Sequence, residues 1–437
     1  MSRSSTGSWL VAAALGAFVC LGAAAPDAGG FATAVPSPAI GADQDVSFSS
    51  GAATIYASVR LPASTNTPVP FAVIINGSGP VDRNGNVEPT EPDTGLWLAD
   101  RLSEAGYASI RYDKLTSGET GLGPYAAGPD TADQRMFDYP PAFGDTTFDE
   151  TFVQPARAAA AYMARLPGID ATRFVVVGHS EGGQIALAVA DEPGIAPIPR
   201  SVVLVEPLYT RVLDAVRRQF DDSIDDADLP ADEARALKAW MDAGIAEIRE
   251  GTPPFGPAPL PPLPDAIGPA AELQTQIVDY VHERYRNRLG KTEDEIDPVV
   301  LARRLHGEGR VLVTCGTKDF NTPCELGGPD GSGVSALAAA FPPGVAELVV
   351  IDDMIHELRD IGDADEDSIA PASWPDYPFS EQLDASLSLF LAERRVVTPD
   401  EQDGGLAVAL LVGGAAVAVV AGAIGIVVIR RRRPTPG

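Results

Sequence analysis

One stretch of the sequence joins an apolar run to a helix-forming run through a tight turn: Val175-Val176-Val177-Gly178-His179-Ser180-Glu181-Gly182-Gly183. It is a Gly-x-Ser-x-Gly pattern with a predicted strand before it and a predicted helix after it. Such a turn forces Ser180 into a strained backbone conformation and lifts its hydroxyl clear of the sheet. Gly178 and Gly182 have no side chains, so the turn can close. We expect Ser180 to be a nucleophile, with the positive end of the following helix beneath any developing oxyanion.

Short apolar runs bounded by turn residues recur on both sides of this turn. They cover residues 71–75, 108–112, 173–177, 201–205, 311–314 and 348–351, and helical patterns lie between them at 95–105, 148–166 and 184–190. Two alternating segments, residues 46–48 and 53–59, predict an antiparallel start. Short buried strands that alternate with helices predict a mostly parallel sheet covered on both faces, so the fold class is α/β.

A serine hydroxyl is a weak nucleophile and needs a neighbouring base. The chain has four histidines, of which His179 is held beside Ser180 by the turn and is expected to be structural. His282 and His306 are expected at the surface. His356 follows the last predicted strand, at the same edge of the sheet as Ser180. We therefore expect His356 to be the base.

The imidazole in turn needs a carboxylate that holds its tautomer. Asp319 follows the predicted strand 311–314 and is the favoured candidate. Glu206, after the strand 201–205, is the rival, because some hydrolases carry the acid one strand earlier. The chain order of Ser180, Asp319 and His356 is the serine–acid–histidine order of the α/β-hydrolase fold.

A glycine-rich segment follows the strand 71–75 and reads Asn76-Gly77-Ser78-Gly79-Pro80-Val81-Asp82-Arg83. Glycines there leave the backbone accessible, so the Ser78 amide, together with the Glu181 amide, is expected to form an oxyanion hole. A plain turn is the alternative interpretation of this segment.

Three motifs together resemble those of bacterial α/β-hydrolase esterases: Gly77-Ser78-Gly79-Pro80-x-Asp82-Arg83, Arg111-Tyr112-Asp113-Lys114 and Gly178-His179-Ser180-Glu181-Gly182. The segment from about residue 43 to 395 is similar to serine aminopeptidase-like and prolyl-oligopeptidase-like carboxylesterases. The resemblance implies that Ser180 is the nucleophile, Asp319 the acid and His356 the base, with Ser78 and Glu181 as oxyanion donors.

The sequence departs from the pattern of these esterases in two short places. Asn76 replaces a usual histidine, and Leu115-Thr116-Ser117-Gly118 replaces the usual continuation after Asp-Lys. Asp82 and Arg83 are expected to form a structural ion pair; binding of substrate is the alternative.

Residues 209–306 interrupt the alternation of strands and helices. The segment is rich in helix formers and charge, contains no strand pattern, and has a proline-rich stretch at residues 253–264. It predicts a helical lid inserted between two parts of the core, 43–208 and 307–396, with its halves joined by a stiff, extended hinge. Because such a lid is also unlike the similar esterases, the substrate class stays open.

The two ends of the chain predict membrane targeting. Residues 1–25 have a basic start, an apolar run and a small-residue cleavage region, which is typical of a signal peptide, and a linker follows at 26–42. After a juxtamembrane linker (397–405), residues 406–429 are uncharged, long enough to span a bilayer and followed by four arginines in the tail 430–437. This predicts a single-pass type I protein of the cell membrane, with the catalytic domain outside the cytoplasm.

Composition and cysteine spacing narrow the function further. The 437 residues carry a net charge of −29, which argues against nucleic acid as a partner because phosphates require a basic surface. Cys315 and Cys324 form an even pair outside the cytoplasm and are expected to form a disulfide. The sequence thus predicts a membrane-anchored serine hydrolase that cleaves carboxylic esters without a metal or organic cofactor. A serine peptidase, an acyltransferase and a non-catalytic binding protein are the alternatives.

Overall fold

The computed structural model describes residues 41–62, 68–87, 90–126, 140–191, 197–305, 309–325 and 333–392. The predicted signal peptide, juxtamembrane linker, membrane anchor and cytoplasmic tail lie outside these stretches, as do His306 and the linker 26–42 except for its last two residues. Within the described stretches, no helix combines the length and the apolar character that a membrane span requires.

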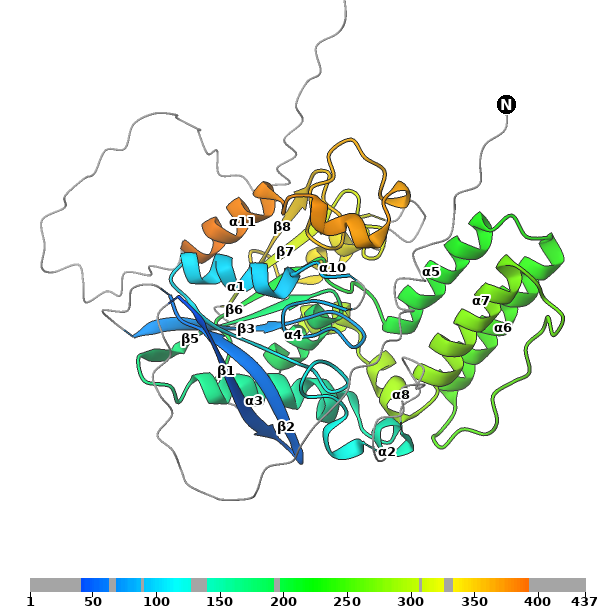
Figure 1. Cartoon of the computed structure of the whole chain (residues 1–437), viewed down its shortest axis with the longest axis horizontal. Helices are drawn as coiled ribbons and strands as arrows, with labels where there is room; N and C mark the ends of the chain where they lie inside the picture. Colours follow the sequence, from blue (N-terminus) through cyan, green and yellow to red (C-terminus); the bar gives the residue numbers. More distant parts are fainter. Residues whose placement is uncertain are drawn as a thin grey trace, which may run out of the picture.

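An eight-stranded sheet lies at the centre of the fold, with the strand order β1-β2-β4-β3-β5-β6-β7-β8 (Figure 1). β1 and β2 pair antiparallel, β2 pairs antiparallel with β4, and the strands from β4 to β8 in this order are parallel. The strands are β1 (Asp43–Ser50), β2 (Ala53–Arg60), β3 (Val69–Ile75), β4 (Ala108–Tyr112), β5 (Ile169–His179), β6 (Ser201–Val205), β7 (Arg310–Gly316) and β8 (Ala346–Ile351). Every predicted strand lies within one of them, so the predicted α/β class is confirmed.

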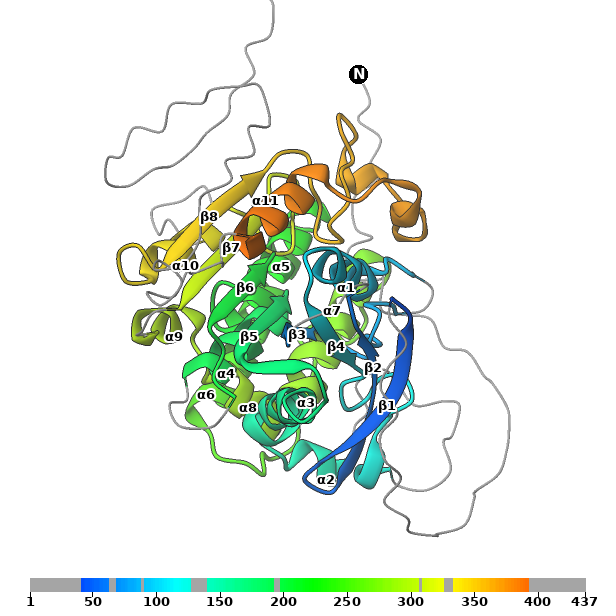
Figure 2. The same cartoon turned by 90° about the vertical axis from the view of Figure 1, so that its left-hand side faces the viewer.

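Helices cover both faces of the sheet, which explains why the central strands are continuous apolar runs. β4 and β6 are buried along their whole length. On one face α3 (Gln154–Met163), α4 (Glu181–Asp191) and α10 (Val334–Ala340) pack onto the strands. On the other face α1 (Thr94–Glu104) and α11 (Glu381–Ala392) do so (Figure 2).

The predicted helix 148–166 differs at its start. Its first turn, η3 (Asp149–Val153), is a π-helical turn, and the regular helix α3 begins only at Gln154. Pro155 has no N–H to donate to the carbonyl of residue 151, so the α-helical hydrogen-bond pattern cannot extend through this point. Two shorter helical elements precede this helix in the chain: η2 (Gly123–Tyr125) and α2 (Pro141–Gly144).

The helical insertion has its own apolar core. It contains α5 (Val212–Asp226), α6 (Ala231–Glu250), α7 (Pro269–Ile277), the π-helical segment η4 (Val278–Arg284), α8 (Arg288–Asp294) and α9 (Pro298–Arg304). Side chains of α5, α6, α7 and η4 form a hydrophobic cluster separate from the two clusters of the sheet, and Figure 1 shows α5, α6 and α7 beside the sheet. No helix forms over 251–268, where the proline-rich stretch lies.

The end of the insertion differs from the predicted lid, which extends to residue 306. The apolar residues Leu301 and Ala302 of α9 are buried in the cluster of the sheet face that carries α4. Leu289 of α8 is buried in the same cluster, so both α8 and α9 pack on the sheet core although they lie within the predicted lid.

The parallel strands bring the predicted site residues to one edge of the sheet. β3, β5, β6, β7 and β8 are followed at their carboxyl ends by Gly77, Ser180, Glu206, Asp319 and His356. Since these strands run in the same direction, their carboxyl ends meet at the same edge. The fold thus assembles one site from loops far apart in the sequence.

Candidate active site

The turn between β5 and α4 holds Ser180 in a left-handed backbone conformation, with φ of 56°. The Ser180 N–H donates to the carbonyl of Val205 at 3.1 Å, and the Ser180 carbonyl accepts from the N–H of Leu208 at 3.0 Å. A non-glycine residue adopts this conformation only where the surroundings enforce it. The strain predicted for Ser180 is therefore present, and the residue stays partly exposed.

The two glycines of the turn are required by close backbone contacts. A Cβ atom on Gly178 would lie 2.1 Å from the carbonyl oxygen of Gly182, and one on Gly182 would lie 2.1 Å from that of Ile75. Only glycine avoids these overlaps. The sheet has the strand order given above, and a strained serine turn follows its fifth strand. This combination is typical of one fold. The chain has the α/β-hydrolase fold.

Comparisons with known proteins give solved structures of low sequence identity to this chain. No family model and no curated protein matches the chain. Proline iminopeptidase from Mycobacterium smegmatis is 17% identical, with a TM-score of 0.43 over 80% of this chain and 98% of that one. A serine hydrolase from Cycloclasticus zankles is 14% identical, with a TM-score of 0.41 over 80% of this chain and 98% of that one. A 2,6-dihydroxy-pseudo-oxynicotine hydrolase is 13% identical, with a TM-score of 0.40 over 72% of this chain, which spans 63% of that hydrolase.

Asp319 and His356 form a buried hydrogen-bonded pair. The Nδ1–H of His356 donates to Asp319 Oδ2 at 2.8 Å, and Thr322 donates to the same carboxylate through its hydroxyl at 2.6 Å and its N–H at 2.8 Å. Burial alone would lower the pKa of His356, but the charge of Asp319 outweighs it and raises the pKa to about 9. The pKa of Asp319, which burial would raise, is held well below its usual value by His356.

Ser180 and His356 line the same cavity but are not hydrogen-bonded to each other. Within the part of the chain that the structure describes, no hydrogen bond joins the Ser180 hydroxyl to the His356 ring, although both residues line the cavity wall. Hydrogen bonds between a nucleophile and its base are often long before substrate is bound. The structure thus brings His356 and Asp319 into contact and leaves Ser180 adjacent to them.

Glu206, the rival acid, lies behind Asp319 and not against His356. It is fully buried, has a φ of 46°, and accepts from the Gly316 N–H at 2.7 Å and from the Thr314 hydroxyl at 3.3 Å. Burial and the nearby charge of Asp319 raise the pKa of Glu206 well above its usual value, which favours the protonated form of this carboxyl. A protonated carboxyl is suited to donate to Asp319, not to accept from a histidine.

His179 supports the loop that carries His356. Its Nε2 lies 2.9 Å from the His356 carbonyl oxygen, to which it can donate, and the two ring centroids are 4.9 Å apart. Burial lowers the pKa of His179 to about 3, so the ring is neutral. This agrees with the structural role predicted for it.

His282 is not at the surface as predicted. The side chain is buried in the insertion, with its ring 4.6 Å from the ring of Trp240. Burial lowers the pKa of His282 to about 4. The sequence does not show this because the ring fills an apolar gap between two helices that are distant along the chain.

The glycine-rich loop after β3 passes directly over Ser180. A Cβ atom on Gly77 would lie 2.9 Å from Ser180 Cβ, and the Gly77 carbonyl accepts a hydrogen bond from the buried Lys114 ammonium. Asn76 donates to the carbonyls of Asp82 at 2.7 Å and Arg83 at 3.1 Å. The asparagine that replaces the usual histidine therefore holds this loop in shape.

The predicted ion pair between Asp82 and Arg83 does not form. Arg83 pairs with Asp113, with 2.7 Å between Nη2 and Oδ2, while Asp82 accepts from the N–H groups of Asn84 at 2.8 Å and Asn86 at 2.9 Å. The chain turns at these residues, with the Gly85 N–H donating to the Asp82 carbonyl at 3.0 Å, and each of the two side chains has partners other than its neighbour. Both residues are structural.

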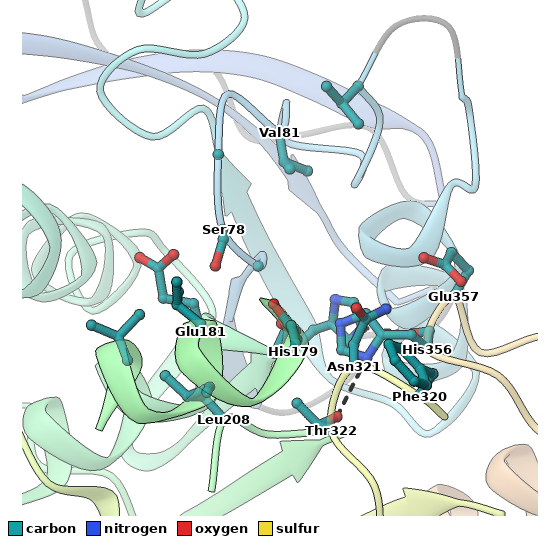
Figure 3. Close-up of a pocket in the computed structure, with 18 of the residues that line it drawn as sticks. Ser78, Val81, His179, Glu181, Leu208, Phe320, Asn321, Thr322, His356 and Glu357 are labelled. Atoms are coloured by element: carbon teal, nitrogen blue, oxygen red, sulfur yellow. Dashed lines mark hydrogen bonds between the residues drawn. The ribbon is translucent and has the colours of Figure 1, made fainter. Parts of the chain in front are cut away.

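A cavity of about 300 Å³ opens over Ser180 and His356. Ser78 and Glu181 lie on one side of His179, and His356, Phe320 and Glu357 lie on the other (Figure 3). One face of α5 supplies much of the remaining wall. Its cavity-lining residues are Val212, Ala215, Val216, Gln219, Phe220 and Ser223. The core therefore supplies the polar floor and the insertion supplies a largely apolar wall.

Two further acidic groups lie beside His356. Glu357 lines the cavity, and burial raises its pKa to about 7; burial likewise raises the pKa of Glu366 to about 8. Much of their charge is thus suppressed at neutral pH. In the described stretches, no group of three or more His, Cys, Asp or Glu side chains has the arrangement needed to hold a metal ion.

The structure contains the expected disulfide between Cys315 and Cys324, with the two Cα atoms 5.3 Å apart. Cys315 is a buried residue near the carboxyl end of β7, and Cys324 closes the loop that carries Asp319. The bridge therefore limits how far this loop can open.

Proposed function

We propose that this protein is a serine hydrolase that cleaves carboxylic esters through an acyl-enzyme. One observation carries the proposal: a strained, accessible Ser180 lies in the same cavity wall as a His356 that is hydrogen-bonded to the buried Asp319 at 2.8 Å. A serine, a histidine and a buried aspartate around one cavity are the residue types that acyl transfer uses.

In the proposed reaction, the Ser180 hydroxyl oxygen attacks the ester carbonyl carbon and His356 Nε2 accepts the hydroxyl proton. The carbonyl oxygen becomes an oxyanion, which the N–H groups of Ser78 and Glu181 stabilise. The proton then passes from His356 to the departing alcohol, leaving an acyl group on Ser180. Water attacks this group, again with His356 as base, and releases the carboxylic acid. Asp319 keeps the proton on Nδ1 throughout, so that Nε2 is free to accept.

The residues of the cavity wall favour an ester substrate that carries an apolar group. Val212, Val216 and Phe220 of α5 present aliphatic and aromatic surface opposite the polar floor. An apolar acyl or alcohol group of modest size would bury its surface there, which is the main source of affinity for such ligands. We assign this wall to substrate selection.

Hydrolysis of p-nitrophenyl esters of graded chain length, measured beside aminoacyl-arylamides, tests this function. We expect ester hydrolysis that is lost in Ser180→Ala. Arylamide turnover exceeding ester turnover would favour the peptidase, and ester turnover that rises when an alcohol acceptor is added would favour the acyltransferase. No turnover and no covalent labelling by a fluorophosphonate would favour the binding protein.

We further propose that residues 406–429 anchor the enzyme in the cell membrane with its catalytic part outside the cytoplasm. The apolar segment with its four following arginines, and the disulfide at Cys315 and Cys324, support this topology. Deleting residues 406–437 should release an active, soluble enzyme. Retention of the truncated protein in the membrane fraction would contradict the anchor.

A further inference from the structure

An arginine of the insertion reaches the residue that follows Ser180. Arg284 ends η4, is only 7% exposed and lines the cavity. Its Nη2 lies 3.6 Å from Glu181 Oε2 and 3.3 Å from Glu293 Oε1. Glu181 and Glu293 are each 1% exposed, so this ion-pair cluster is shielded from water. Side chains of the insertion and of the core thus meet directly beside the nucleophile.

Within this cluster, Arg284 is the residue of the insertion whose positive charge stabilises the Glu181 carboxylate. Burial raises the pKa of Glu293 to about 8, so this carboxyl is largely protonated at neutral pH. Glu181 behaves differently: burial alone would raise its pKa, but Lys114 and Arg284 outweigh burial and lower it. Without Arg284, a buried carboxylate would lose one of the two cations that stabilise its charge.

Both proposed oxyanion donors are held by a buried cation. Lys114 donates to the carbonyl of Gly77, next to Ser78, and Arg284 pairs with the side chain of Glu181. A second hydrogen bond joins α4, the helix that begins at Glu181, to the insertion: Gln184 donates to the carbonyl of Ile296 at 3.0 Å. The position of the Glu181 amide is thus fixed from the core by the turn and from the insertion by Arg284.

We propose that Arg284 is a positioning residue, which acts through Glu181 to hold the oxyanion-binding amide in place and makes the insertion part of the catalytic site. The inference rests on the proposed ester hydrolysis. The role proposed for Arg284 differs from that of the apolar wall of α5, which we assign to substrate selection. Misplacing a reacting group by about 1 Å can lower a rate roughly 100-fold, so a small displacement of this amide is enough to be measured.

The test measures kcat and KM for p-nitrophenyl butyrate, and the Ki of butylboronic acid, which binds Ser180 as a tetrahedral adduct. Arg284→Gln is expected to lower kcat by about 10- to 100-fold. KM should change by less than about threefold, and the Ki should rise by a factor comparable to the loss in kcat. Arg249→Gln is the matched control, because Arg249 pairs with Asp214 and Asp294 inside the insertion and does not contact Glu181.

A cycle with Glu181→Gln tests whether Arg284 acts through Glu181. The double variant is expected to have the kcat of Arg284→Gln within about threefold, because the two side chains act as one unit. Multiplied losses, or a rise in KM with unchanged kcat, would overturn the proposal and assign Arg284 to direct substrate binding. If Arg284→Gln does not fold, the single variant Glu181→Gln carries the test, since it removes the charge with which Arg284 pairs and keeps the backbone amide; kcat equal to that of the parent would overturn the proposal.

The outcome can be told apart from failure of the proposed function. If the parent hydrolyses no ester, or if Ser180→Ala retains activity, the proposed function is wrong. If the parent is active and depends on Ser180, while Arg284→Gln changes only thermal stability as Arg249→Gln does, only the present inference is wrong.

Discussion

The sheet core and the helical insertion contribute to one cavity in different ways. The core supplies Ser180, Asp319 and His356 from the carboxyl ends of parallel strands, where backbone geometry fixes each side chain. The insertion supplies the apolar face of α5, which is amphipathic and packs on its own cluster. We therefore expect substitutions in the core to change the rate of the catalytic step, and substitutions in the insertion to change which ester is preferred.

The two regions meet through arginines of the insertion. Arg284 approaches Glu181, and Arg218 donates to the carbonyls of Phe320 at 2.9 Å and Asn321 at 2.8 Å, in the loop that follows Asp319. The insertion is therefore joined to the core both beside Ser180 and beside the loop of Asp319. At these contacts, substitutions should affect both the catalytic step and the choice of substrate.

The largest effect is expected from removing the nucleophile of the core. Ser180→Ala should lower kcat/KM for p-nitrophenyl esters by about 10⁴-fold or more, because no other group can form the acyl-enzyme. Circular dichroism and thermal melting should remain those of the parent. Ser388→Ala, at an exposed serine of α11 outside the cavity lining, serves as the control and should retain activity within about threefold. Residual activity of Ser180→Ala within tenfold of the parent would contradict its role.

The second prediction compares the two buried carboxyl groups of the core. Asp319→Asn should lower kcat by about 10⁴-fold, because the wrong tautomer of His356 is then favoured. Glu206→Gln should lower kcat by less than about fivefold, because a glutamine can still accept from the Gly316 N–H and donate to Asp319. Kinetics at saturating ester distinguishes the two, and the reverse ranking would move the acid to Glu206.

The difference between these carboxyl groups shows what the sequence could and could not predict. The strand-turn-helix pattern around Ser180 and the apolar strand runs predict the fold because they are local and periodic. The same pattern places both Asp319 and Glu206 at the correct edge of the sheet, but it does not say which one faces His356. That choice depends on side-chain packing and hydrogen bonds across neighbouring strands.

Contacts between the core and the insertion were beyond sequence analysis for a related reason. The pairing of Glu181 with Arg284 joins residues that lie far apart in the chain, and neither belongs to a motif that predicts the other. His282 likewise has no sequence signal for burial, because its partner Trp240 lies on a different helix. Long-range pairs of this kind require the three-dimensional arrangement of the helices.

The pH dependence of ester hydrolysis should be set by titratable groups of the sheet core alone. His356 must be neutral to accept the Ser180 proton, and its pKa is raised to about 9 chiefly by Asp319, with smaller contributions from Glu357 and Glu366. We therefore expect kcat/KM to increase with pH by up to about tenfold per unit below this pKa and to level off above it. A pH profile of ester hydrolysis checks this, and a rate that is flat or falls from neutral to alkaline pH would contradict the pairing of His356 with Asp319.

The smallest effect is expected from the insertion wall. Val216→Phe should fill part of the cavity and lower kcat/KM for octanoyl relative to acetyl esters by about tenfold, because the larger ring takes the space of the longer chain. Arg217→Gln is the control, since Arg217 is exposed on the same helix. Equal losses for acetyl and octanoyl esters would show that this wall does not select the substrate.

Covalent labelling tests most directly the central claim, that Ser180 of this α/β-hydrolase fold is a catalytic nucleophile. The protein is incubated with a fluorophosphonate, digested, and mapped by mass spectrometry. We predict a single adduct on the peptide that contains Ser180, no adduct in Ser180→Ala, and loss of ester hydrolysis in step with labelling. An adduct on a different residue, or full hydrolysis by a protein that the probe does not label, would contradict this assignment.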